Sequence, residues 1–238
     1  MTISIAIIYP EILGTYGDRG NALAMSYRAN KRNIETEIIE IRANDVLPTS
    51  CDIYMLGGGE DNAQTLATNL LENQKDSLKT ISNNSIILAV CAGFQILGKQ
   101  FPTVEQKLFK GLDIIDVTTK CGTPRIIGEV ITKCSISNVG ELTGFENHGG
   151  RTILGPNSKP LGNVTHGKGN GVEMSDSQYC DGYFSEHIIG TYMHGPVLAR
   201  NPKFCDYLIS KITGIETLSP IISDTAMDLH RERISSVQ

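Results

Sequence analysis

Apolar residues in the first hundred positions fall into short runs, separated by stretches in which they recur with helical spacing. The runs that predict strands are Ile3–Tyr9, Glu35–Ile41, Ile53–Leu56 and Ile86–Val90. The stretches that predict helices are Ala22–Asn30 and Ala63–Thr80. Nearly continuous runs are typical of strands buried on both faces. Strands alternating with helices predict an α/β fold, with a mostly parallel central sheet flanked by helices.

The pattern changes after about residue 111, where helical periodicity disappears. Short runs at Arg125–Ile131 and Leu142–Phe145 predict additional strands, and residues 147–171, rich in Gly, Asn and Pro, predict long loops. We expect these segments to lie against the first half without forming a separate domain. A strand at His187–Tyr192 and a helix at Pro202–Thr213 complete a single domain over residues 1–213. The tail, residues 214–238, shows no clear pattern.

Composition narrows the class of protein. Apolar residues make up 40% of the chain and charged residues 20%, which is typical of a globular protein and not of a disordered one. The formal net charge is −5, and no run of Lys or Arg exceeds two residues, so a nucleic-acid-binding surface is not expected. No apolar stretch reaches the roughly 18 residues that span a bilayer, and the N-terminus lacks the basic region of a signal peptide.

The six cysteines are scattered, with no C-x-x-C pair that would predict a zinc ribbon. We therefore expect a cytoplasmic protein with reduced thiols and no metal site in this chain.

Cys91 follows the apolar run Ile86–Val90 and precedes small residues, Ala92 and Gly93. A nucleophile on such a strand-to-helix turn projects above the sheet, and the backbone N–H of the next residue can stabilise an oxyanion. The position at a helix N-terminus also favours the thiolate. The alternative, a buried structural cysteine, is the usual role of a free cysteine.

The turn Gly57-Gly58-Gly59 ends the third predicted strand. Its backbone N–H groups are not screened by side chains, so it can supply the second half of an oxyanion hole beside Cys91. The alternative is a turn chosen for the conformational freedom of glycine. The acidic pair Glu60-Asp61 that follows argues against a phosphate site.

His194 lies just beyond the last predicted strand, before Gly195 and Pro196. An imidazole at that position can take the proton of a thiol and later activate water, so Cys91 and His194 form a candidate dyad. His166 and His230 lie in polar stretches and are expected to be solvated.

Three motifs resemble class I glutamine amidotransferases of the cobyric-acid-synthase-like (CobB/CobQ-like) branch. They are Leu56-Gly-Gly-Gly-Glu-Asp61, Ala89-Val-Cys-Ala-Gly-Phe-Gln-Ile-Leu-Gly98 and Gly190-Thr-Tyr-Met-His-Gly195. Within the branch, Gly14-Thr-Tyr-Gly-Asp-Arg-Gly-Asn21 and Gly144-Phe-Glu-Asn-His-Gly-Gly-Arg151 are similar to the glutaminase subunits of bacterial lipid II isoglutaminyl synthases. The similarity runs from residue 3 to about 213.

The resemblance implies roles for individual residues. Cys91 is the implied nucleophile, His194 the base, and Arg125 the residue that binds the α-carboxylate of L-glutamine. A guanidinium suits that role because it pairs with a carboxylate through two parallel hydrogen bonds. Without the resemblance, Arg125 would be interpreted as a solvated surface residue. The oxyanion would be held by backbone groups of Ala92 and of Gly57–Gly59.

The resemblance also implies a partner chain. Ammonia would pass to a MurT-like Mur ligase subunit in a heterodimer, which amidates the D-glutamate of lipid II in peptidoglycan synthesis. ATP and any zinc are expected on that subunit, and no cofactor is expected in this chain.

The sequence departs from the wider class at two places. Many class I members place a glutamate two residues after the histidine, whereas this chain has Pro196 there. An orienting carboxylate would have to come from elsewhere, such as Asp18 or the partner chain. The stretch Gly171–Ser185 is less similar to the family and is interpreted as a surface insertion.

Three alternatives stay open at this point. A related enzyme of the same branch would deliver ammonia to another acceptor, such as a corrinoid carboxylate. A non-catalytic regulatory subunit would keep only the fold. A different cysteine hydrolase would use a similar turn, although Arg125 and the three motifs argue against it.

Overall fold

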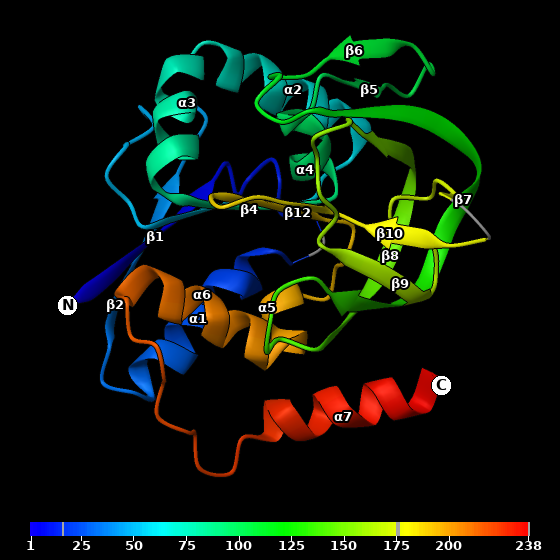
Figure 1. The fold of residues 1–238 in the computed structure, drawn as a ribbon. Helices are drawn as coiled ribbons and strands as arrows, with labels where there is room; N and C mark the ends of the chain where they lie inside the picture. Colours follow the sequence, from blue (N-terminus) through cyan, green and yellow to red (C-terminus); the bar gives the residue numbers. More distant parts are fainter. Residues whose placement is uncertain (16, 175–176, 238) are drawn as a thin grey trace.

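The computed structural model describes residues 1–15, 17–174 and 177–237. A six-stranded sheet lies at its centre, in the order β11-β12-β4-β3-β1-β2 (Figure 1). Its strands are β1 (Thr2–Ile8), β2 (Glu35–Ile41), β3 (Ile53–Leu56), β4 (Ile86–Val90), β11 (Tyr183–Phe184) and β12 (Ile188–Thr191). Neighbours pair in parallel except β11, which runs antiparallel to β12. The predicted α/β fold with a mostly parallel sheet is therefore confirmed.

Helices cover both faces of this sheet. Every residue of β3 and β4 is buried, as their apolar sequences predict. The helices on one face are α2 (Asp61–Glu72), α3 (Lys75–Asn84) and α4 (Ala92–Leu97) (Figure 1). Those on the other face are α1 (Arg19–Asn30), α5 (Val197–Arg200) and α6 (Pro202–Thr213).

The helix predicted over residues 63–80 is in fact two helices, α2 and α3. The chain breaks at Asn73 and Gln74, where the Gln74 side chain accepts a hydrogen bond from the Leu47 amide (2.6 Å) and donates one to the Asp45 carbonyl (3.1 Å). The prediction of one continuous helix was wrong because this tertiary contact fixes the break.

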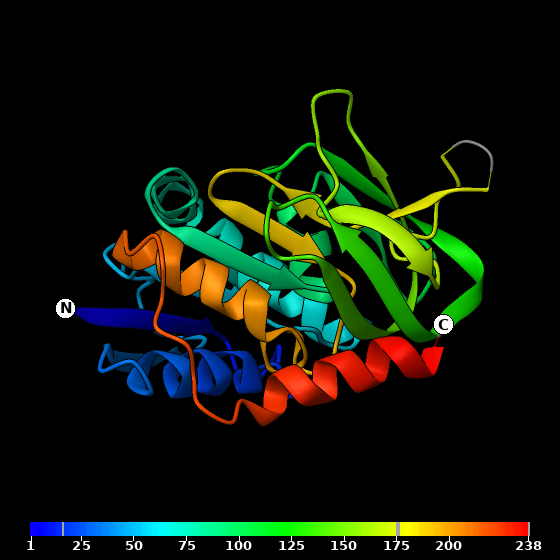
Figure 2. The same cartoon turned by 60° about the horizontal axis from the view of Figure 1, so that its bottom comes forward.

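A second sheet lies beside the first, in the order β10-β9-β7-β5-β6, with β8 paired to β7 (Figures 1 and 2). Its strands are β5 (Gln100–Pro102), β6 (Leu108–Lys110), β7 (Val117–Cys134), β8 (Glu141–Leu154), β9 (Gly162–His166) and β10 (Tyr179–Asp181). The long loops predicted over residues 147–171 are thus wrong in part. Residues 147–154 continue β8 and residues 162–166 form β9, because β7 pairs with both strands.

The stretch Gly171–Ser185, of which residues 175–176 lie outside the described residues, is not a simple surface insertion. It contains β10 and β11, which extend the two sheets by pairing with β9 and β12. Asp181 within it is fully buried. The segment is part of the support for the end of β12.

Most of the tail forms α7 (Thr225–Val237), which packs against α5, α6 and β8 (Figure 2). His230 on this helix is buried, and its Nδ1 lies 2.9 Å from the Arg200 carbonyl oxygen. The expectation that His230 is solvated was therefore wrong, whereas His166 is exposed as expected. No helix within the described residues is long and apolar enough to cross a bilayer.

The strand order brings three loops together. In the register of the sheet, Leu56 of β3 lies beside Ala89 of β4, and Val90 of β4 lies beside Thr191 of β12. The glycine turn, Cys91 and His194 follow these strands, so they meet at one edge of the sheet. All six cysteines are free thiols in the structure.

Candidate active site

Cys91 occupies a strained turn between β4 and α4. Its backbone has φ 52° and ψ −105°, a combination that non-glycine residues rarely adopt. The Cys91 amide donates to the Thr191 carbonyl (2.8 Å), and the Gln95 amide donates to the Cys91 carbonyl (3.0 Å). These two hydrogen bonds hold the turn in place, one through the end of β12 and the other through α4. A side chain held above the sheet by a strained turn is the geometry of a nucleophile elbow, which favours the catalytic interpretation of Cys91.

The glycine turn lies directly against this elbow. The Gly93 amide donates to the Gly57 carbonyl (3.2 Å), which docks the start of α4 on the end of β3. The Gly58 amide donates to Asp18 Oδ2 (2.6 Å), so it is already bonded to a carboxylate. Gly59 and Ala92 line the same cavity as Cys91, whereas Gly57 and Gly58 do not. Of the predicted oxyanion donors, the structure therefore places Gly59 and Ala92 at the cavity.

His194 is held by the second sheet. Its amide donates to the Phe145 carbonyl (2.9 Å), and the Phe145 amide donates to the His194 carbonyl (3.1 Å). This pairing gives a structural reason for the motif Gly144–Arg151, because β8 fixes the loop that carries the candidate base. The His194 side chain is 3% exposed.

The electrostatic surroundings of His194 favour its charged form. Burial lowers the pKa of His194, but Asp18 and the Cys91 thiol together outweigh burial and raise that pKa to about 9. Asp18 Oδ1 lies 4.0 Å from His194 Nδ1. The sequence allows an orienting carboxylate from Asp18 or from a partner chain. Of these two, Asp18 is adjacent to the imidazole in the structure.

Arg125 lies at the same cavity, where β7 shifts its register against β8. Its Nε donates to Asn147 Oδ1 (2.6 Å) and its Nη2 donates to the Asn147 carbonyl (3.0 Å). The side chain is exposed, so its guanidinium retains donors for a ligand. Arg125 therefore lies where the substrate-binding interpretation requires it, and not at an unrelated surface.

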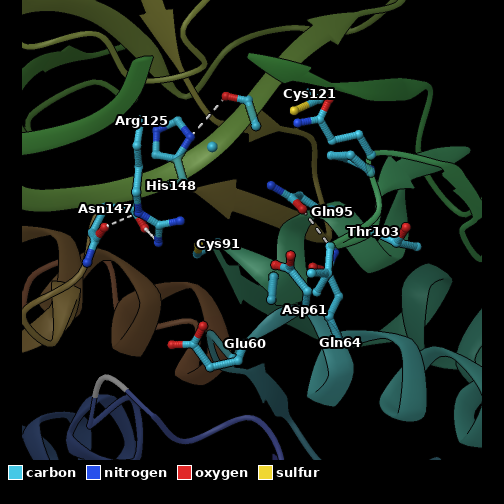
Figure 3. A pocket seen from close by; sticks show the side chains of 17 residues that line it. Glu60, Asp61, Gln64, Cys91, Gln95, Thr103, Cys121, Arg125, Asn147 and His148 are labelled. Atoms are coloured by element: carbon cyan, nitrogen blue, oxygen red, sulfur yellow. Dashed lines mark hydrogen bonds between the residues drawn. The ribbon is translucent and has the colours of Figure 1, made fainter. Parts of the chain in front are cut away.

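The cavity encloses about 180 Å³. Figure 3 shows Arg125 and Asn147 on one side of it, Glu60 and Asp61 on the other, and Cys91 between them. A cation and two carboxylates therefore face each other across the Cys91 side chain. This arrangement suits a small zwitterion, such as an amino acid, whose carboxylate and ammonium groups carry opposite charges.

A buried polar chain supports the cavity, and the sequence patterns did not single it out. Gln64 Nε2 donates to Gln95 Oε1 (2.9 Å), Gln95 Nε2 donates to Tyr192 Oη (2.9 Å), and Tyr192 Oη lies 2.5 Å from Thr152 Oγ1. The His148 ring stacks on Tyr192 with centroids 3.8 Å apart. Gln95, His148 and Tyr192 all belong to the motifs quoted above, which is the signal that could have found them.

Two further buried groups shape the site. Burial, together with the nearby positive charges, lowers the pKa of His148 to about 3, so this imidazole is neutral. Asp181 accepts hydrogen bonds from Thr191 Oγ1 (2.5 Å) and the Tyr192 amide (3.1 Å), which holds the end of β12. Within the described residues, no group of three or more His, Cys, Asp and Glu side chains is placed to hold a metal ion.

Comparison with known proteins adds three findings. A family model for the CobB/CobQ-like glutamine amidotransferase domain matches residues 4–202. Subunit GatD of the glutamine-hydrolyzing lipid II isoglutaminyl synthase of Staphylococcus aureus is 38% identical over 201 residues, covering 84% of this chain and 79% of that protein. The GatD subunit of Streptococcus pneumoniae is 34% identical over 213 residues, covering 87% of this chain and 79% of that protein.

A solved structure shares the fold. The crystal structure of a glutamine amidotransferase superposes with a TM-score of 0.58 at 15% identity, covering 88% of this chain and 98% of the other.

Proposed function

The chain belongs to the CobB/CobQ-like glutamine amidotransferase family, and from this premise we propose that it is the glutamine-hydrolysing subunit of a lipid II isoglutaminyl synthase. The observation that carries the proposal is the strained Cys91 turn, which opens beside His194 into a cavity lined by Arg125. A non-catalytic subunit of the same fold would have no need for that strain. The two GatD relatives support the lipid II acceptor.

The reaction begins with a Cys91 thiolate and a His194 imidazolium. The thiolate attacks the side-chain amide carbon of glutamine, and the amides of Gly59 and Ala92 stabilise the oxyanion that forms. His194 then donates its proton to the amide nitrogen, the C–N bond breaks, and ammonia leaves a thioester on Cys91. In the second half, His194 takes a proton from water, which attacks the thioester and releases glutamate and the thiolate.

Substrate binding follows from the charges across the cavity. We assign the α-carboxylate of glutamine to the Arg125 guanidinium and its α-ammonium group to the side of Glu60 and Asp61. This orientation directs the side-chain amide toward Cys91, which lies between the two walls.

Arg125→Ala is expected to raise KM for glutamine roughly 10–100-fold with a much smaller change in kcat. A charge-assisted pair contributes about 1.5–3 kcal/mol, and it is made equally in the ground state and the transition state. Steady-state ammonia release measures both constants. Arg125→Lys is the matched control, because it keeps the charge without the planar fork, and it should recover part of the lost affinity. An unchanged KM in the alanine variant would mean that Arg125 does not bind glutamine and is a solvated surface residue.

We further propose that ammonia passes to a Mur-ligase-like partner in a cytoplasmic heterodimer. ATP, and any zinc, would be bound by that partner, where ATP activates the carboxylate of D-glutamate in lipid II. The similarity to GatD, which is one subunit of its enzyme, supports assigning the ligase chemistry to another chain.

Reconstitution with the partner tests the acceptor. With glutamine labelled at its amide nitrogen, ATP, lipid II and a MurT-like subunit, we expect the label in the peptide amide, as measured by mass spectrometry. The matched reaction replaces lipid II and its ligase with a corrinoid acid and its synthase. Label in the corrinoid and not in lipid II would refute the lipid II assignment while leaving glutamine hydrolysis intact.

A further inference from the structure

The motif Gly144–Arg151 ends in an arginine that the reaction steps above leave without a role. Arg151 is half-buried on β8, and it is not among the described residues that line the cavity. Its Nη2 donates to the Pro124 carbonyl (2.6 Å), and its Nη1 donates to the Gly150 carbonyl (3.0 Å). The side chain therefore joins β8 to the residue directly before Arg125.

The segment that carries Arg125 needs such a contact because it departs from the regular sheet. The register of β7 against β8 shifts between Cys121 and Ile126, where residues 122–125 of β7 face only Gly149 of β8. These residues form a bulge, and a bulge lacks the regular hydrogen bonds that hold a strand in place. The position of Arg125 therefore depends on other contacts with the bulge.

Two glycines allow the Arg151 side chain to reach this bulge. A β-carbon on Gly122 would lie 2.4 Å from Arg151 Cγ and 2.6 Å from its Cζ. A β-carbon on Gly171, in the loop after β9, would lie 2.7 Å from Arg151 Cδ. Real β-carbons essentially never come this close to other atoms, so Arg151 occupies its place only because both residues are glycine.

The loop on the outer side of Arg151 is itself attached to β8. Glu146 on β8 is 2% exposed, and its carboxylate accepts hydrogen bonds from the amides of Lys168 (2.9 Å) and Gly169 (2.7 Å). The stem of Arg151 is thus enclosed between a fixed loop and the bulge. This packing holds the guanidinium on the Pro124 carbonyl.

A second residue of β8 orients the Arg125 side chain itself. The side-chain oxygen of Asn147 accepts from Arg125 Nε, and the Asn147 carbonyl accepts from Arg125 Nη2 (Figure 3). Both contacts use one side of the planar guanidinium, so the edge formed by Nη1 and Nη2 is left for a carboxylate. Pairing through two parallel hydrogen bonds requires a defined position as well as a defined orientation.

We infer that Arg151 is a positioning residue for binding of the glutamine α-carboxylate, because it fixes the bulge from which Arg125 reaches the substrate. The inference rests on the proposed glutaminase function of the site. Asn147 orients the Arg125 side chain, and Arg151 holds the backbone that carries it. Since Arg151 acts through Arg125, it contributes to substrate affinity and not to the chemical steps at Cys91.

The test uses the full chain with Arg151→Met, which keeps an unbranched stem against Gly122 and removes the guanidinium. In steady-state ammonia release, we expect KM for glutamine to rise roughly 5–30-fold, with kcat changed by less than about twofold. Arg151→Lys keeps the charge without the planar fork and should recover part of the affinity. Arg42→Met is the matched control, since Arg42 is 71% exposed beyond β2, and it should leave KM unchanged.

Combination with Arg125→Ala shows whether Arg151 acts through Arg125. If it does, the double variant Arg125→Ala/Arg151→Met should have the KM of Arg125→Ala alone, within about twofold. If the two increases in KM multiply, Arg151 contributes independently of Arg125, and the inference is overturned.

4-Aminobutanamide, which is glutamine without its α-carboxylate, distinguishes positioning from general damage to the fold. Ligand bound in the cavity should protect Cys91 from alkylation by iodoacetamide, as measured by peptide mass mapping. In Arg151→Met, the concentration of L-glutamine that gives half protection should rise roughly 5–30-fold, whereas that of 4-aminobutanamide should stay the same. An equal rise for both ligands would mean that the substitution damages the whole cavity, and would refute the role of Arg151.

Gly122→Ala is a second variant, in which the new β-carbon displaces the Arg151 side chain without removing it. It should weaken protection by L-glutamine and leave protection by 4-aminobutanamide unchanged. If both Arg151→Met and Gly122→Ala keep the wild-type response to L-glutamine, the inference is wrong.

Protection of Cys91 requires binding but not hydrolysis, so the two proposals can fail separately. A wild-type chain that L-glutamine protects but that releases no ammonia, alone or with its partner, would refute the proposed function and leave the role of Arg151 in binding to be decided by the variants. A wild-type chain that L-glutamine does not protect would overturn both.

Discussion

Replacement of Cys91 with alanine is expected to lower the rate of glutamine hydrolysis by roughly 10³–10⁶-fold, because the thioester cannot form without the sulfur. Binding should persist, since the cavity wall that carries Arg125 is unchanged. Ammonia release measures the rate, and calorimetric titration with glutamine measures the remaining affinity. Alanine keeps the β-carbon, so the strained backbone conformation at position 91 remains, and the free energy of unfolding should change little.

Cys121→Ala is the matched comparison for this variant. Cys121 is exposed and lines the same cavity, so it is the other thiol that a substrate could meet. Its replacement should change the rate by less than about tenfold, since it lies on β7 with no strained turn beneath it. If Cys121→Ala abolishes hydrolysis and Cys91→Ala does not, the nucleophile has been assigned to the wrong wall of the cavity.

The strands and turns of the first half were predictable because their signals are local. Runs such as Ile86–Val90 are buried on both faces, so almost every residue must be apolar. Cys91 and the glycine turn follow such runs directly, and parallel pairing then places them at one edge of the sheet. The sequence therefore locates the candidate nucleophile without knowledge of any distant contact.

The second half was less predictable for a physical reason. Residues 147–154 contain Gly and Asn, which favour turns when considered alone. In the structure they form the end of β8, because pairing with β7 satisfies their backbone groups. The preference of a residue for a strand depends on its neighbours across the sheet, and one sequence does not contain that information.

The environment of the base was predictable only in part. His194 is a candidate base from its position after a strand, but Asp18 lies far earlier in the chain and is brought near it where Gly20 packs against Pro196. The sequence allowed a carboxylate from Asp18 or from a partner chain and offered no way to choose. The chain of buried hydrogen bonds from Gln64 to Thr152 was unpredictable for the same reason, since each hydrogen bond joins residues that are distant in the sequence.

Gly93→Ala is expected to be the most damaging glycine replacement at the elbow. A β-carbon at position 93 would lie 2.6 Å from the Leu56 carbonyl oxygen, 2.8 Å from Leu56 Cβ and 2.9 Å from Leu56 C. Most of these atoms are backbone atoms of a buried strand, so no side chain can move aside to make room. Either α4 must shift away from β3, or the free energy of unfolding must fall by about 2–4 kcal/mol.

Thermal unfolding and ammonia release together measure this effect. For a chain of this size, the loss corresponds to a fall in Tm of roughly 4–16 °C. A shift of α4 would also carry Cys91 and the Ala92 amide away from Gly59, so hydrolysis should decline even at temperatures where the variant is folded. Gly149→Ala is the control for stability, because a β-carbon there would meet no atom within 4 Å. If both variants unfold at the parental Tm, the contact between α4 and β3 is not the close packing that holds the nucleophile in place.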